Sequence, residues 1–349
     1  MRTIVSGPSA LSAEEPEHST RGPRRSPSGR PVTSVPLLLA PAGTPEAVGA
    51  AVDAGADAVY VGLKGWSRGG ERRELGWTEL VAASRRVTSA GGKLQVAINT
   101  IPKPRELAEL FERVPALLDL GIRELIVNDV GILAAFRRRF PELRLTASIG
   151  CGAQTVADVS FLRGLGADAV VLPGTVSPSE AREIRAVSGI TIEIMVHMVE
   201  EFILLGKCWM PSYVHLKPSS LPAIFPSEDV AGDDATDGVR RGVRQTGSMK
   251  RGGVGACYRI CQQPWELYSL ERRMEARHFP SRQISRLAEV NAYAEAGVDV
   301  LKLQGRSLPV ELLAPLVRRY RHAIDAGAAP AASALAFAEL PAAWAVVGR

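Results

Sequence analysis

A phrase that recurs along the sequence limits the fold more than any other feature. It reads AGADAVYVG at residues 54–62, LGIRELIVND at 120–129, LGADAVVLPG at 165–174 and AGVDVLKLQG at 296–305. Each copy has a glycine that ends a helix, one or two polar residues, and then a continuous apolar run. Such a run predicts a strand that is buried on both faces, as in parallel sheets.

Further apolar runs and helical segments complete the pattern. Four more predicted strands lie between the copies, at Leu37–Ala40, Lys93–Ile98, Leu143–Ala147 and Ile190–Val196. Most of the eight predicted strands are followed by a segment with helical periodicity, for example Pro45–Asp53, Trp77–Ser89, Pro104–Leu118, Val156–Leu165, Ser179–Val187, Ser281–Ala296 and Pro309–Ala326. Strand–helix alternation repeated eight times predicts an α/β fold, a (β/α)8 TIM-type barrel. An open, doubly wound sheet is the alternative.

The predicted domain organisation is one barrel with additions. Residues 36–326 form the barrel, residues 1–35 are a Ser/Pro/Arg-rich tail expected to be disordered, and residues 327–349 are an Ala-rich tail. An insertion at about 198–280, between the seventh and eighth strands, contains three of the four cysteines. It leaves the barrel from the C-terminal end of a strand, where barrel enzymes place their active sites.

Composition narrows the class of protein. A hydrophobic fraction of 46% and a charged fraction of 23% are typical of a globular protein in water. No apolar run is long enough to span a membrane, and the N-terminus lacks a secretory apolar segment, so we expect a cytoplasmic protein. The net charge of +5 is dilute over 349 residues. We therefore expect a small-molecule substrate and do not expect nucleic acid as a partner.

Residues just past the strands of a barrel converge on one mouth. Lys64 and Arg306, with Lys302 and Gln304 beside them, are predicted to bind an anionic substrate.

The candidates for catalysis at the same mouth are Asn99, Asp129 and His197. Asp129 could instead cap the following helix, and His197 could be a core histidine with satisfied hydrogen bonds. The sequence contains no G-x-S-x-G, H-E-x-x-H or P-loop motif, so it carries no familiar hydrolase signature.

The four cysteines are candidate metal ligands. Cys208, Cys257 and Cys261 lie late in the chain, and Cys151 follows the fifth predicted strand. Thiolates are the ligands that hold iron–sulfur clusters, and a 4Fe–4S cluster usually takes four. The alternative is that these cysteines are buried as small apolar residues.

Several sequence blocks resemble the collagenase-like peptidase family of unknown catalytic type, number thirty-two of that class. The blocks are LLLAPAGTPEAVGAAVDAGADAVYVG from residue 37, INT at 98–100, IVNDVG at 126–131, EIMVH at 193–197, GKCWMPSY at 206–213, GACYRICQQPWEL at 255–267 and LKLQGR at 301–306. The resemblance implies a barrel with an iron–sulfur cluster. It also implies two kinds of relative: proteases, and proteins that support oxygen-independent hydroxylation of ubiquinone precursors or RNA bases, with prephenate as oxygen donor.

The chain departs from this family at three positions. Glu201 stands where the family's first cluster cysteine is expected, and Trp66 stands where one branch has a replacement cysteine. Gln304 occupies the place of a family carboxylate. The fourth cluster ligand is therefore either Cys151, which is the softer donor and follows a strand, or Glu201, and we favour Cys151.

These observations favour an iron–sulfur-dependent, oxygen-independent hydroxylase-like enzyme that acts on a small anionic or aromatic substrate. One alternative is a peptidase, as the family name suggests. Another is a non-catalytic iron–sulfur subunit whose partner is a homologous barrel.

Overall fold

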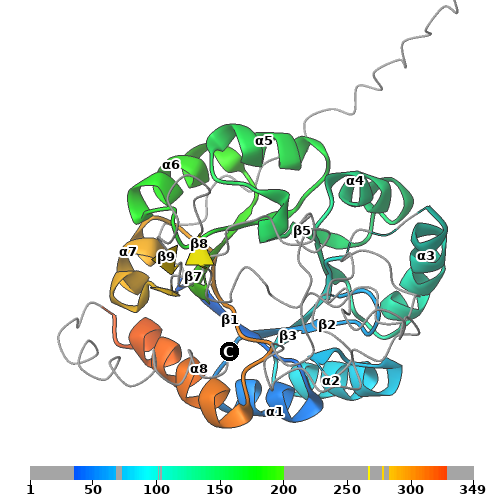
Figure 1. Ribbon diagram of the computed structural model, residues 1–349, viewed down its shortest axis with the longest axis horizontal. Helices are drawn as coiled ribbons and strands as arrows, with labels where there is room; N and C mark the ends of the chain where they lie inside the picture. The colour runs from blue at the N-terminus through cyan, green and yellow to red at the C-terminus, as the bar shows by residue number, and fades with distance from the viewer. Residues whose placement is uncertain are drawn as a thin grey trace, which may run out of the picture. The chain divides into compact units, whose positions relative to one another are not determined.

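The computed structural model describes residues 35–67, 73–100, 102, 104–199, 266–267, 277–278 and 283–327. Eight parallel strands close into a barrel (Figure 1), which confirms the predicted fold class. The strands are β1 (Leu37–Pro41), β2 (Ala58–Gly62), β3 (Lys93–Ile98), β4 (Glu124–Val127), β5 (Arg144–Ala147), β6 (Ala169–Leu172), β7 (Thr191–Val199) and β11 (Val300–Leu303). Pairing of β7 with β11, and of β11 with β1, closes the ring.

Helices surround the barrel, as Figure 1 shows. They are α1 (Pro45–Asp53), α2 (Trp77–Ser89), α3 (Pro104–Asp119), α4 (Val130–Arg139), α5 (Val156–Gly164), α6 (Pro178–Ser188), α7 (Val290–Glu295) and α8 (Val310–Asp325). Several begin at a side chain that the sequence provides for this purpose: Thr44, Thr155 and Ser177 each accept a hydrogen bond from a backbone N–H in the first turn. The main core lies between the strands and these helices.

The segment predicted as a helix at Ser281–Ala296 differs from the structure. Strand β10 (Gln283–Ser285) pairs antiparallel with the end of β7, and a 3-10 turn η7 (Leu287–Glu289) follows it, so α7 has only six residues. Ile284 buries its side chain in a cluster with Met198 of β7, and this packing outweighs helical periodicity.

Most of the insertion and most of both tails lie outside the described residues. The described parts of the insertion are β8 (Glu266–Leu267) and β9 (Arg277–His278), which pair antiparallel. The predicted boundaries of the tails and of the insertion therefore stay predictions.

The aspartate of the recurring Gly-x-Asp sequence makes the same two contacts in three places, one with a backbone N–H of a neighbouring strand and one with an arginine. Before β6, Asp168 accepts the backbone N–H of Leu145 in β5 at 2.9 Å and pairs with Arg137 of α4. The Arg137 Nε also donates to the carbonyl of Gly166 at 2.9 Å. Asp168 thus connects the start of β6 with the neighbouring strand β5 and with α4, the helix that precedes β5.

The copies before β2 and β11 repeat this arrangement. Asp57 accepts the N–H of Leu38 in β1 at 2.7 Å and pairs with Arg321 of α8 at 2.8 Å. Asp299 accepts the N–H of Ile192 in β7 at 2.9 Å and pairs with Arg185 of α6 at 3.4 Å. We call these three sets of contacts the aspartate clamps. The copy before β4 has Arg123 in the aspartate position.

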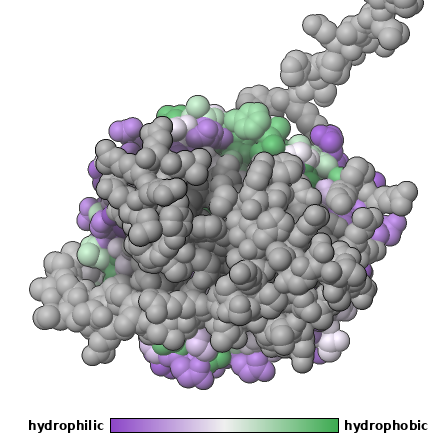
Figure 2. Space-filling model, viewed as in Figure 1, coloured by the Kyte–Doolittle hydropathy of each residue, from purple (hydrophilic) through white to green (hydrophobic). Residues whose placement is uncertain are grey.

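The outer surface carries some apolar side chains. Figure 2 shows hydrophobic surface over α5, where Val156 and Phe161 are exposed. Among the described residues, no helix has both the length and the apolar character that a membrane crossing requires.

Removing a clamp carboxylate should destabilise the barrel. We expect Asp168→Ala to lower the free energy of unfolding by about 1–3 kcal/mol, because the buried Leu145 N–H loses its acceptor. Asp53→Ala is the matched control, since Asp53 and Arg86 form an exposed pair whose loss should cost under about 1 kcal/mol. Urea unfolding measures both; equal losses would contradict a special role for the clamp.

Candidate functional site

The mouth of the barrel contains a turn that brings Arg306 over β2. Arg306 follows β11, and its guanidinium donates a hydrogen bond to the Ser67 hydroxyl. Gly62 at the end of β2 makes room for this contact, because a Cβ atom there would collide with both groups. The absence of a side chain at residue 62 is therefore what lets the guanidinium lie on the strand end.

Two further cations lie near this side of the mouth. Lys64 is exposed and Arg73 is half-buried, with its Cβ close to Gly43 at the end of β1. Glu74 is buried and accepts the backbone N–H of Gly65 at 2.9 Å. The structure thus places Lys64 and Arg306, predicted from the sequence, on one side of the mouth.

Amide and hydroxyl side chains follow the neighbouring strands. Asn99 and Thr100 come after β3, and Asn128 after β4; all three are buried. The backbone N–H of Asn99 and the hydroxyl of Thr100 both donate to the carbonyl of Trp66, at 3.1 and 3.4 Å. The carbonyl of Trp66 therefore links the segment that follows β2 to the end of β3.

Asp129 is held by the helix that follows it. One carboxylate oxygen accepts the N–H groups of Gly131 at 2.9 Å and Ile132 at 3.1 Å, which makes Asp129 the N-cap of α4. These contacts correspond to the capping alternative that the sequence left open.

His197 packs toward the helical layer. The register between β7 and β11 shifts after Lys302, and the His197 ring lies edge-on to Tyr320 of α8 with ring centres 5.9 Å apart. Burial lowers the pKa of His197 to about 4, so the imidazole is neutral at pH 7. The packing against Tyr320 and the neutral imidazole both suit the core-histidine alternative rather than proton transfer at the mouth.

Cys151 is the one predicted metal ligand among the described residues. It ends the 3-10 turn η2 (Ile149–Cys151) after β5, and its thiol donates to the carbonyl of Val127 at 3.4 Å. Its half-buried side chain packs against the core between strands and helices. Cys208, Cys257, Cys261 and Glu201 lie outside the described residues. Within the part of the chain that the structure describes, no three His, Cys, Asp or Glu side chains gather into a metal site.

Lys302 lies inside the barrel and contacts other protein groups. Its ammonium pairs with Glu193 of β7 at 2.8 Å and lies 4.9 Å from the centre of the Tyr60 ring. Only 5% of the Lys302 side chain and 1% of the Glu193 side chain are exposed. Lys302, which the sequence analysis assigned to substrate binding, is thus enclosed by protein, whereas Gln304 lies at the half-buried turn beyond it.

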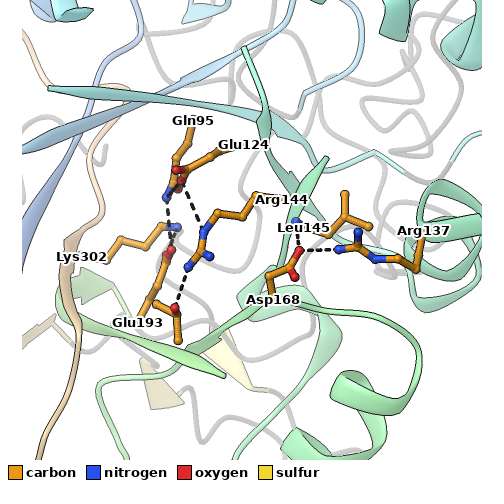
Figure 3. Close-up of polar contacts among 9 residues, drawn as sticks. Gln95, Glu124, Arg137, Arg144, Leu145, Asp168, Glu193 and Lys302 are labelled. Carbon is orange, nitrogen blue, oxygen red and sulfur yellow. Dashed lines mark hydrogen bonds and ion pairs between the residues drawn. The ribbon is translucent and has the colours of Figure 1, made fainter. Parts of the chain in front are cut away.

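The Lys302–Glu193 pair belongs to a larger polar network that sequence reasoning missed (Figure 3). Gln95 of β3 donates to Glu193 at 3.3 Å and to Glu124 of β4 at 3.1 Å. Arg144 of β5 approaches Glu124 at 4.0 Å and donates to the Thr191 hydroxyl at 2.6 Å. The signal was present in the sequence, because these polar residues interrupt otherwise apolar strands at inward-facing positions.

The depressed pKa of His197 predicts how stability depends on pH. The neutral ring is favoured in the folded state, so its contribution is complete above the unfolded pKa near 6.5 and is lost as pH falls toward about 4. We expect His197→Phe to remove up to about 2 kcal/mol of the stability loss between pH 7 and pH 5. Urea unfolding at both pH values tests this; parallel losses in variant and wild type would contradict it.

Comparison with known proteins gives relatives of two kinds. The chain is 26% identical over 311 residues to tRNA hydroxylation protein P of Escherichia coli, covering 84% of this chain and 69% of the relative. It is 27% identical over 294 residues to the 23S rRNA 5-hydroxycytidine C2501 synthase of Escherichia coli, covering 83% and 39%. It is 23% identical over 308 residues to the Collagenase of Porphyromonas gingivalis, covering 83% and 65%.

The names of the first two relatives overturn one expectation from the sequence. Those proteins modify tRNA and rRNA, which contradicts the prediction of a small-molecule substrate with nucleic acid not expected as a partner. That prediction rested on a net charge averaged over the whole chain. Such an average does not exclude local cationic contacts.

A family model that matches most of the sequence shows to which family the chain belongs. The model of peptidase family U32 matches residues 43–343, which include every strand of the barrel after β1. The chain therefore belongs to peptidase family U32.

Proposed function

We propose that this protein takes part in oxygen-independent hydroxylation of a base in RNA. The observation that carries the proposal is the similarity, over more than four fifths of the chain, to proteins named for hydroxylation of tRNA and of 23S rRNA. Belonging to the U32 family is compatible with this activity but does not select it, because the chain is also similar to a protein named Collagenase.

The mouth offers groups suited to an unstacked base and its phosphate. A base must leave the helical stack before an enzyme can reach its ring, and it is then read through its edge by amide and hydroxyl groups. We assign this role to Asn99, Thr100 and Asn128, which follow adjacent strands.

Arg306 supplies a positive charge at this mouth, which suits a negatively charged group of the substrate. A guanidinium presents two fixed donors to an oxyanion, and Lys64 adds a mobile positive charge nearby. We propose that Arg306 binds an oxyanion of one of the reactants. This oxyanion is either a phosphate of RNA or a carboxylate of the predicted oxygen donor, prephenate. The contact with Ser67 holds the guanidinium over β2 for this role.

An iron–sulfur cluster remains part of the proposal, with Cys208, Cys257 and Cys261 as ligands. Such a cluster would supply electron transfer. The position of Cys151 fits it poorly as the fourth ligand, because its thiol donates to the Val127 carbonyl and packs on the core. We therefore now favour Glu201, seven residues before Cys208, over Cys151.

Peptidase activity is the second candidate, supported by the similarity to the Collagenase of Porphyromonas gingivalis. The hydroxyls that donate to carboxylates in two capping boxes, Thr155 to Asp158 and Ser177 to Glu180, serve helix ends rather than a nucleophile. Among the described residues, neither of these two hydroxyl–carboxylate pairs is available as a catalytic pair for a peptidase, so we rank this activity second.

Nucleoside analysis tests the proposed reaction. Purified protein, or a host strain that expresses it, is compared with the Cys261→Ser variant by mass spectrometry of digested tRNA and rRNA. We expect a nucleoside one oxygen atom heavier with the wild type and at least about a tenfold loss with the variant, because a thiolate ligand is removed. Gelatin cleavage without any hydroxylated nucleoside would favour the peptidase instead.

Iron analysis under anaerobic conditions separates the ligand candidates. We expect Cys257→Ser to lose most of the bound iron, and Cys151→Ser to retain the iron content and absorption spectrum of the wild type. Glu201→Gln should lose iron or change the spectrum. Loss of iron in Cys151→Ser, with Glu201→Gln unchanged, would show that Cys151 is the ligand after all.

A further inference from the structure

A proline interrupts the backbone ladder between β1 and β11. The N–H of Leu37 donates to the carbonyl of Asp299 at 3.0 Å, and Leu37 is in register with Val300. In a parallel pair such bonds recur at every second residue, so the N–H of residue 41 should donate to the carbonyl of Leu303. Residue 41 is Pro41, which has no N–H.

The hydroxyl of Tyr60 takes the place of the missing donor. Tyr60 lies on β2, on the other side of β1, and its Oη donates to the Leu303 carbonyl oxygen at 2.9 Å. Its ring is buried under the ammonium of Lys302, which in turn is fixed by its ion pair with Glu193. The charged network inside the barrel therefore packs against the ring that carries this hydroxyl.

Leu303 also lies beside a bulge in the other neighbour of β11, because β7 has one extra residue, Val196, between the partners of Lys302 and Leu303. The register with β7 shifts between Lys302 and Leu303, and pairing resumes when the N–H of Gln304 donates to the carbonyl of His197 at 2.8 Å. A bulge bends the strand that carries the extra residue, here β7, and so changes where β7 meets the end of β11. Two bonds, at the Leu303 carbonyl and the Gln304 N–H, thus set the direction of the turn that leads to Arg306.

We propose that Tyr60 is a positioning residue for Arg306. By replacing the N–H that Pro41 lacks, its hydroxyl holds the end of β11 in place, and the Arg306 guanidinium consequently lies over Gly62 beside Ser67. Tyr60 itself is buried inside the barrel and touches no reactant in this role. The consequence for ligand binding rests on the proposed function, in which Arg306 binds an oxyanion of the reactants.

The first experiment measures the position of Arg306 without any ligand. Tyr60→Phe is compared with Tyr293→Phe, the matched control, because Tyr293 is buried and donates to the carbonyl of Val176 at 2.7 Å. Both variants should show similar falls in Tm. Phenylglyoxal labelling with peptide mapping should modify Arg306 several-fold faster in Tyr60→Phe than in either the wild type or Tyr293→Phe. Unchanged labelling in Tyr60→Phe would overturn the inference.

The second experiment tests whether Tyr60 acts through Arg306. The affinities for a short single-stranded RNA and for prephenate are measured by calorimetry in the wild type, Tyr60→Phe, Arg306→Ala and the double variant. We expect a loss of about fivefold for Tyr60→Phe and of about tenfold or more for Arg306→Ala, for the ligand whose oxyanion Arg306 binds. The double variant should bind like Arg306→Ala alone.

The outcomes separate this inference from the proposed function. Additive losses in the double variant, or an equal loss in Tyr293→Phe, would overturn the positioning role of Tyr60. Wild-type affinity of Arg306→Ala for both ligands would remove Arg306 from the proposed function, while faster labelling of Arg306 in Tyr60→Phe would still support its positioning by Tyr60.

Discussion

The arrangement of this barrel depends on the carboxylates that stand at the entrances of β2, β6 and β11. Asp57, Asp168 and Asp299 each accept a backbone N–H of a neighbouring barrel strand. Each also pairs with an arginine from the helix that comes before that strand around the barrel. A buried N–H without an acceptor is costly, so these contacts oppose a slip of one strand against the next. Register decides which side chains face inward and where each strand ends, and hence what the mouth contains.

Polar residues inside the barrel connect the strands to the mouth. Lys302 and Glu193 form a buried pair, whose net contribution to stability is small although loss of one partner is strongly destabilising. The pair holds the Lys302 ammonium over the ring of Tyr60. The Tyr60 hydroxyl in turn replaces the hydrogen bond that Pro41 cannot make to β11. A polar interior can therefore influence a site that it does not reach directly.

The chain is similar both to a named Collagenase and to named RNA hydroxylation proteins, so the barrel alone does not specify the reaction. The mouth of this chain combines buried amides with a guanidinium seated over a glycine. Those groups suit recognition of a base and an oxyanion better than attack on a peptide bond, which requires an activated nucleophile or a metal-bound water.

The sequence by itself determined the barrel, because the repeated glycine, polar residue and apolar run encode a helix end followed by a buried strand. It also located Arg306 and Lys64 after strands, at the mouth. Only the tertiary structure decided the partners of individual side chains: Lys302 faces Glu193, and His197 faces Tyr320. Likewise, Ile284 packs against the buried Met198, so the first part of the segment predicted as a helix is the strand β10. Periodicity reports that a residue is buried, whereas the group it meets depends on strand register and on chain segments far away in the sequence.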